Sequence, residues 1–81
     1  MKIVRWFVSR DYTNATELTV TAADFYDEDD AREYYRWKKR DENAYRKKYG
    51  RDPAYVWKLG KRTETWDDER RIRYEYEWLE G

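Results

Sequence analysis

Basic side chains gather at helical spacing between residues 31 and 49, and they form the strongest candidate for a binding site. At 100° per residue, six basic residues and one Asn fall on a single arc: Arg32, Arg36, Lys39, Arg40, Asn43, Arg46 and Lys47. The arc contains no acidic residue. Such a surface could bind nucleic-acid phosphates or an acidic protein face. The alternative interpretation is a solvated helix face, because runs of charge usually serve solvation.

Trp37 lies beside this arc, about 60° outside the apolar stripe of the same helix. If exposed, Trp37 with Arg36 and Arg40 has the composition of a binding hot spot. It could also stack on an unpaired base. The alternative is that the first hairpin loop partly buries it. We therefore predict a partner-binding site made of Trp37, Arg32, Arg36, Arg40, Lys39 and Lys47.

Catalytic chemistry finds little support in the sequence. There is no His, the residue most used in general acid–base catalysis, and there is no Cys. Ser9 is the only serine and has no recognisable base to activate it, and the three glycines form no phosphate-binding loop. The acidic run 27–30 lacks the spacing of a calcium-binding loop and is explained as a helix start. We therefore expect no enzyme, no bound metal and no cofactor.

Aromatic residues dominate the apolar composition. Two Phe, five Trp and nine Tyr stand against nine Ile, Leu and Val residues in total. Because a chain of 81 residues has few aliphatic side chains to bury, rings must supply much of its core. The remaining rings should lie on the surface, where Tyr, Trp and Arg commonly anchor a protein partner.

Length and charge restrict the class of protein. Eighty-one residues form a single domain, residues 1–81. The 18 basic and 18 acidic residues give zero net charge, which argues against a general nucleic-acid coat. No apolar run reaches the length of a membrane span, and the first residues do not resemble a signal peptide. We therefore expect a cytoplasmic protein that does not contact a membrane.

Residue patterns predict a strand pair followed by a long helix. Residues 2–9 carry β-branched and aromatic side chains on both faces, which indicates an interior strand, and residues 16–21 form its hairpin partner. The helix begins after Asp27, where the acidic first turn suits the helix dipole. It ends at Tyr49, before the cap Gly50.

The expected helix has an apolar stripe about 100° wide, as a helix packed on a sheet requires. Its members are Ala31, Tyr34, Tyr35, Tyr45 and Tyr49. Lys38 and Glu42 fall in the same stripe and should reach out past its edge. Tyr26, just before the helix, should pack onto Ala31 as a hydrophobic staple.

The last third predicts a long hairpin of residues 54–66 and 71–79. Pairing Trp66 with Arg71 brings opposite charges face to face along the two strands. The same register turns four side chains of the second strand toward the core: Ile72, Tyr74, Tyr76 and Trp78. A tighter hairpin at Gly60, with three short strands, is the alternative.

The order ββαββ predicts an α+β two-layer sandwich, in which a four-stranded antiparallel sheet carries one long helix on one face. We expect a small protein-binding module, such as an inhibitor or accessory protein of a phage or mobile element acting on a host protein. The alternative is a nucleic-acid binder that uses the basic helix face. An exposed edge strand could also pair with a second copy to give a homodimer. Strand order and the identity of the partner are left open.

Overall fold

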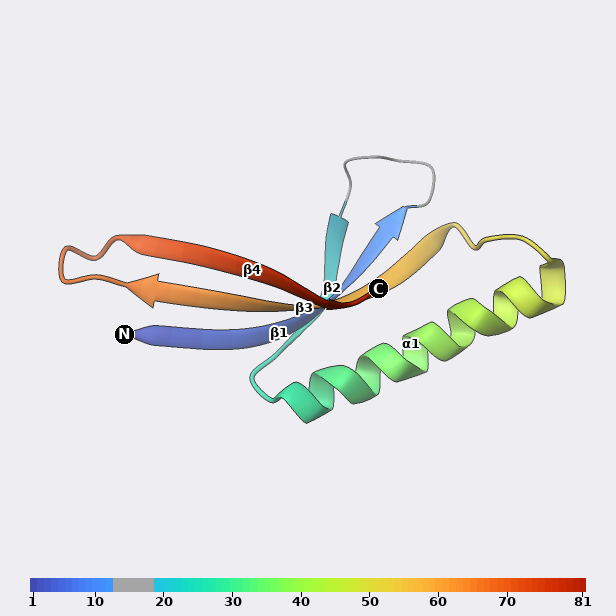
Figure 1. Ribbon diagram of the computed structural model, residues 1–81, viewed down its shortest axis with the longest axis horizontal. Helices are drawn as coiled ribbons and strands as arrows, with labels where there is room; N and C mark the ends of the chain where they lie inside the picture. The colour runs from blue at the N-terminus through green and yellow to red at the C-terminus, as the bar shows by residue number, and fades with distance from the viewer. Residues whose placement is uncertain (13–18) are drawn as a thin grey trace.

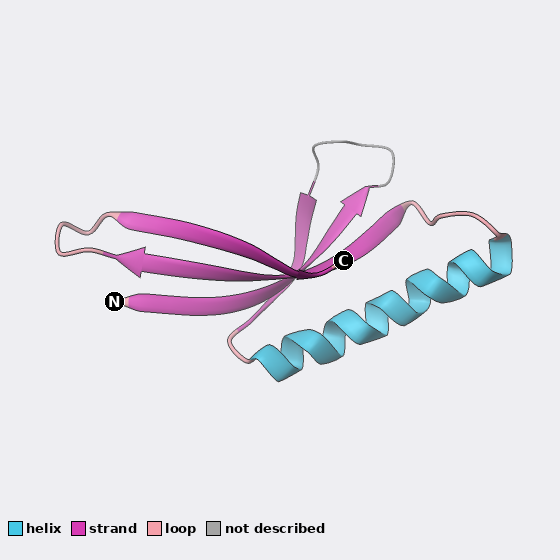
Figure 2. Ribbon diagram, viewed as in Figure 1, coloured by secondary structure: helices cyan, strands magenta, loops and turns pink. Residues whose placement is uncertain are grey.

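The computed structural model describes residues 1–12 and 19–81 of the chain. Its elements are β1 (Lys2–Tyr12), β2 (Thr19–Phe25), α1 (Glu28–Tyr49), β3 (Tyr55–Trp66) and β4 (Ile72–Glu80). One antiparallel sheet of four strands carries α1 on one face, as Figures 1 and 2 show. The predicted α+β architecture and the predicted element order are confirmed.

β1 lies inside the sheet, as its two partly apolar faces predict. The strand order is β2-β1-β3-β4, and each neighbouring pair is antiparallel. β1 pairs with β3 along its whole length and with β2 along its second half. β2 continues to Phe25 instead of ending at Thr21. The part of the predicted second strand before Thr19 lies outside the described residues.

α1 has the predicted bounds because both of its caps form. The Asp27 carboxylate accepts a hydrogen bond from the backbone N–H of Asp30 at 3.1 Å. Gly50 is left-handed, with φ at 65°, and its N–H donates to the carbonyl of Arg46 at 2.8 Å. Only glycine adopts this conformation without steric cost. In the described ranges, no helix has the length and apolar character that a membrane span requires.

The core lies between α1 and the middle of the sheet. Val8 and Leu59 are fully buried against Ala31 and Tyr35. Partly buried side chains, most of them rings, enlarge this cluster: Trp6, Phe25, Tyr34, Trp57 and Leu79. Rings therefore supply much of the apolar contact, as the composition predicts.

Two tyrosines at the ends of α1 lie outside the core, contrary to prediction. Tyr49 is half exposed and packs on Tyr45 instead, with ring centroids 4.6 Å apart. Tyr26 is largely exposed, and its hydroxyl accepts a hydrogen bond from Arg5 at 2.9 Å instead of its ring stapling Ala31. The core cluster is shorter than the helix, so rings at the helix ends find neighbours beyond it.

β3 and β4 form the predicted long hairpin, but the register differs by one residue. Trp66 pairs with Ile72 and not with Arg71. The turn takes in one more residue because the Asp67 carboxylate accepts the N–H groups of Glu69 and Arg71, each at 2.9 Å. A shift of one residue moves every side chain to the other face. The predicted core orientation is therefore wrong for Ile72, Tyr74, Tyr76 and Trp78.

Gly60 lies within β3 and not in a hairpin turn. The strand continues through it, and the pairing with β4 shifts register between Leu59 and Gly60. A Cβ atom at position 60 would lie 2.4 Å from Cζ of Phe7, whose ring covers this glycine. Glycine is required by this close approach, and the alternative of three short strands is wrong.

The sheet extends well beyond the helix (Figure 1). α1 runs along one half of the sheet, while the β3–β4 hairpin and the start of β1 project from the other half. The molecule measures 53 × 28 × 15 Å, and its radius of gyration is 14.9 Å. A compact chain of this length has a radius of about 12 Å. The projecting half is a single sheet layer that α1 does not cover.

Candidate functional site

The predicted site residues of α1 divide into a free group and a paired group. Arg36, Arg40 and Lys47 are exposed, and no described residue gives them a hydrogen bond or ion pair. Arg32, in contrast, has two carboxylate partners. Its Nε lies 2.9 Å from Glu28 Oε2, and its Nη1 lies 3.7 Å from an oxygen of Glu80 in β4.

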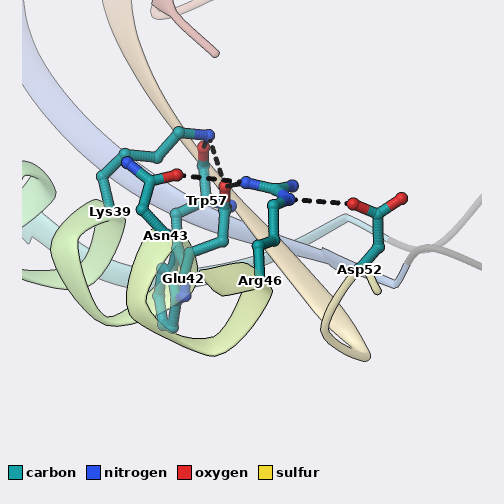
Figure 3. A network of polar contacts seen from close by, with 6 residues as sticks. All are labelled: Lys39, Glu42, Asn43, Arg46, Asp52 and Trp57. Atoms are coloured by element: carbon teal, nitrogen blue, oxygen red, sulfur yellow. Dashed lines mark hydrogen bonds and ion pairs between the residues drawn. The ribbon is translucent and has the colours of Figure 1, made fainter. Parts of the chain in front are cut away.

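Lys39 and Arg46 turn from the arc toward the start of β3, into the network that Figure 3 shows. The Lys39 ammonium lies 2.8 Å from Glu42 Oε2 and donates to the Trp57 carbonyl at 3.3 Å. Glu42 Oε1 accepts the Trp57 N–H at 2.7 Å. Arg46 donates to Glu42, and its Nε lies 2.8 Å from Asp52 Oδ1. The network joins α1 to the edge of β3, beyond the end of β4.

Glu42 is buried, whereas the helix pattern predicts that it reaches out past the stripe. It is 3% exposed. Burial opposes ionisation, but hydrogen bonds from Lys39, Trp57 and Arg46 outweigh it and hold the pKa of Glu42 below its ordinary value. Because the carboxylate binds a backbone N–H and two cations, its role is structural.

Trp37 is exposed, which decides between the two readings of its position. It is 53% exposed and packs edge-to-face on Tyr34, with centroids 6.0 Å apart. Tyr34 in turn lies 5.5 Å from Phe25. These rings line a shallow groove of about 310 Å³ together with Asp30 and Glu33. Carboxylates therefore border the groove, and not the arginines that were predicted to accompany Trp37.

Lys38 fills the space between rings and does not extend past the helix stripe as predicted. Its ammonium lies 4.6, 5.5 and 5.3 Å from the ring centroids of Trp37, Tyr34 and Trp57. Contacts between a cation and a ring face are favourable at these distances. Lys38 thus links the Trp37 groove to β3.

A second candidate surface is the sheet face opposite α1, which we call the open face. Alternation along the paired strands places these residues on it: Ile3, Arg5, Phe7, Lys58, Gly60, Arg62, Glu64, Trp66, Ile72, Tyr74, Tyr76 and Trp78. The four β4 side chains are 40–64% exposed. Of the described elements, none lies over this face (Figure 1).

Rings on the open face pack against one another. Phe7 is only 5% exposed because Trp78 and Tyr76 flank it edge-to-face, with centroids 5.4 and 6.1 Å away. Tyr74 stacks on Tyr76 at 6.5 Å. Rings held by such contacts lose little conformational freedom when a partner covers them.

Most cations of the open face already have carboxylate partners. Arg62 lies 3.4 Å from Asp24, and Lys58 lies 3.0 Å from Asp11. Arg5 stacks on a tyrosine ring at 4.9 Å and has no carboxylate partner among the residues described. The face also carries the carboxylate of Glu64, which accepts a hydrogen bond from the Trp66 ring N–H at 2.7 Å, so it is mainly aromatic with charges of both signs.

The open face was missed in the sequence because the assumed register turned its rings inward. The alternating residues did not reveal this orientation. The positions that alternate with the β4 rings are Arg73, Glu75 and Glu77, and their neighbours in β3 include Thr63 and Thr65. A face lined by Thr, Arg and Glu is a poor core, so this polarity favoured rings that face inward, which is the orientation that the structure overturns.

Comparisons with known proteins give no family or relative for this chain. No protein-family model matches it, and neither a curated protein nor a solved structure shows a significant match. Among the described residues, no group of three or more acidic side chains is placed to hold a metal ion.

Proposed function

We propose that this chain is a small non-enzymatic module that binds a protein partner through its open face. The observation that supports this function is the uncovered row of Ile72, Tyr74, Tyr76 and Trp78. A sheet normally buries its apolar face against a second layer. Large exposed apolar patches mark interaction surfaces, and Tyr and Trp are the usual anchors there.

The open face favours a partner of defined chemistry. Its rings suit aliphatic or aromatic side chains. The guanidinium of Arg5 contacts the hydroxyl and ring of Tyr26 but no carboxylate among the residues described, so it suits an Asp or Glu at the border of such a patch. A protein surface with apolar side chains and a nearby Asp or Glu meets both requirements.

Nucleic-acid binding through α1 is the second candidate function. The free side chains of Arg36, Arg40 and Lys47 favour it. However, the other three basic residues of the arc already have carboxylate partners: Arg32, Lys39 and Arg46. Paired cations neutralise fewer phosphates, so they contribute less to the counterion release that drives such binding. Protein binding is therefore the function we prefer.

The Trp37 groove is a further contact region in this proposal. We retain the prediction that Trp37, with Arg36 and Arg40, contributes to partner binding. Size, charge balance and ring content suit a cytoplasmic inhibitor or accessory protein of a phage or mobile element, acting on a host protein.

Affinity capture from nuclease-treated cell extract tests the proposed function, followed by affinity measurements with the captured protein. We expect Tyr76→Ala, which removes the most exposed ring of the β4 row, to weaken binding at least about tenfold. Tyr49→Ala is the matched control, because Tyr49 is a half-exposed ring distant from the open face.

Each surface gives a separate result in this experiment. Loss of binding in Trp37→Ala or in Arg36→Glu with Arg40→Glu, while Tyr76→Ala binds normally, would move the interface to α1. Material that is captured from untreated extract but not from nuclease-treated extract, with an affinity that falls steeply with salt, would establish the nucleic-acid function instead.

A further inference from the structure

The outer edge of β4 has no neighbouring strand in the described chain. β4 is last in the strand order, and α1 approaches the backbones of β1, β2 and β3 but not that of β4. Outward N–H and C=O groups along such an edge are open to another strand. Proteins usually protect an edge with Pro, charged side chains, a bulge or short length. Between Ile72 and Trp78, β4 has no Pro and no bulge, and its charged side chains are Arg73, Glu75 and Glu77.

Charges along this edge follow a self-complementary order. Arg71 and Arg73 come first, and Glu75 and Glu77 follow. Arg73, Glu75 and Glu77 alternate with the rings, so they belong to the face opposite the open face. Arg71 is the last residue of the turn before β4, and its guanidinium pairs with Glu69. A second copy of the same strand, running antiparallel, would bring its acidic half beside this basic half.

One antiparallel register satisfies all of these charges. When the pairing is centred on Tyr74, Arg73 lies opposite Glu75 of the second copy, and Arg71 lies opposite its Glu77. Centring the pairing on Arg73 or on Glu75 would place two like charges directly opposite each other. Pairings centred between two residues would place rings of one copy beside charges of the other.

We propose that two copies of this chain associate through β4, antiparallel and centred on Tyr74, to form one continuous eight-stranded sheet. The two-fold axis is perpendicular to the sheet, so both open faces lie on the same side. Ile72 then lies opposite Tyr76 of the second copy, and the two Tyr74 residues face each other. This self-association uses the strand edge and goes beyond the proposed binding of a partner on the face.

Sedimentation of charge variants tests this association. The wild-type mass should rise with concentration from 10.2 kDa toward twice that value. In Glu75→Arg, Arg73 of each copy would lie opposite an arginine of the other copy. This repulsion should weaken association about tenfold or more. Exchanging both residues, Arg73→Glu with Glu75→Arg, should restore it. Within one chain these positions face Thr65 and Thr63, so the exchange breaks no directly opposed ion pair in the hairpin.

Each outcome of this experiment decides the proposal. A wild-type chain that stays at its single-chain mass up to about 1 mM overturns it. A dimer that Glu75→Arg leaves unchanged, or that the double exchange does not restore, also overturns it. Circular dichroism verifies that each variant is folded, and Arg73→Glu provides the same repulsion if Glu75→Arg does not fold. If a variant loses partner binding but sediments with the same mass as the wild type, only the proposed function is affected.

Cysteine cross-linking tests the register independently, because the chain contains no cysteine of its own. In Tyr74→Cys, the two introduced thiols lie directly opposite each other and should form a covalent dimer on oxidation. In Tyr76→Cys, they lie four residues out of register, about 13 Å apart, and should not. Equal cross-linking at both positions, or cross-linking at position 76 alone, contradicts the proposed pairing.

Discussion

At the scale of single residues, two side chains of α1 take the place of a missing strand. β4 ends where it pairs with Leu59, so the next outward backbone groups of β3 belong to Trp57. Glu42 accepts the N–H of Trp57, and Lys39 donates to its carbonyl. A helix thereby satisfies the backbone groups that would otherwise leave the sheet edge open.

Removing the Glu42 charge should reduce stability in a pH-dependent way. Because the pKa of Glu42 is lowered in the folded state, the unfolded chain binds a proton at this residue more readily than the folded chain does. The ionised Glu42 therefore makes its full contribution to the free energy of unfolding above about pH 5, and this contribution is lost in acid. We expect Glu42→Gln to lower the free energy of unfolding by about 1–3 kcal/mol at pH 7. The difference from wild type should shrink toward pH 3.

Urea unfolding at both pH values measures this effect. Glu33→Gln, an exposed carboxylate of the same helix, is the matched control and should leave stability nearly unchanged. An equal loss of stability for Glu42→Gln at pH 3 and at pH 7 would contradict a role for the ionised carboxylate.

Gly60 and Phe7 should be energetically coupled. Gly60→Ala places a methyl group against the Phe7 ring, and we expect a loss of about 1–3 kcal/mol. In a Phe7→Ala background the same change should be neutral or stabilising, because Ala suits a strand better than Gly does. A double-mutant cycle from unfolding curves measures the coupling. A coupling energy near zero would show that the ring does not require glycine.

At the scale of elements, the β3–β4 turn decides which face of β4 carries the rings. Asp67 binds the N–H groups of Glu69 and Arg71, and the backbone N–H of Asp67 donates to the Arg71 carbonyl at 3.1 Å. Arg70 takes up a left-handed conformation, with φ at 62°. These bonds complete a five-residue turn, so Trp66 meets Ile72.

Asp67→Ala should destabilise the hairpin by about 1 kcal/mol, because two backbone N–H groups lose their acceptor. Hydrogen exchange of the β4 amides should accelerate most in its first residues. Asp68→Ala, the neighbouring exposed acid, should change neither quantity. If both variants behave alike, the Asp67 carboxylate does not hold the turn.

At the scale of the whole molecule, a short core supports a long sheet. α1 covers one half of the sheet, and the remaining strands continue outward as a single layer (Figure 2). That layer is polar on the helix side and aromatic on the open face. The open face and the β4 edge are therefore two separate surfaces for association, and the proposals for partner binding and for self-pairing address one each.

The sequence alone determined the features that depend on neighbouring residues. Asp27 and Gly50 set the ends of α1, and the two partly apolar faces of residues 2–9 set β1 inside the sheet. The surplus of rings over core volume also predicted exposed aromatic side chains, which the structure contains.

Tertiary structure alone decided the features that depend on contacts between distant elements. The face of the β4 rings follows from one additional turn residue, which neither periodicity nor charge pairing along the strands reveals. The burial of Glu42 follows from an unpaired N–H of Trp57, fifteen residues away along the chain. Periodicity gives the side of an element on which a residue lies, but only the packed fold determines what lies opposite that residue.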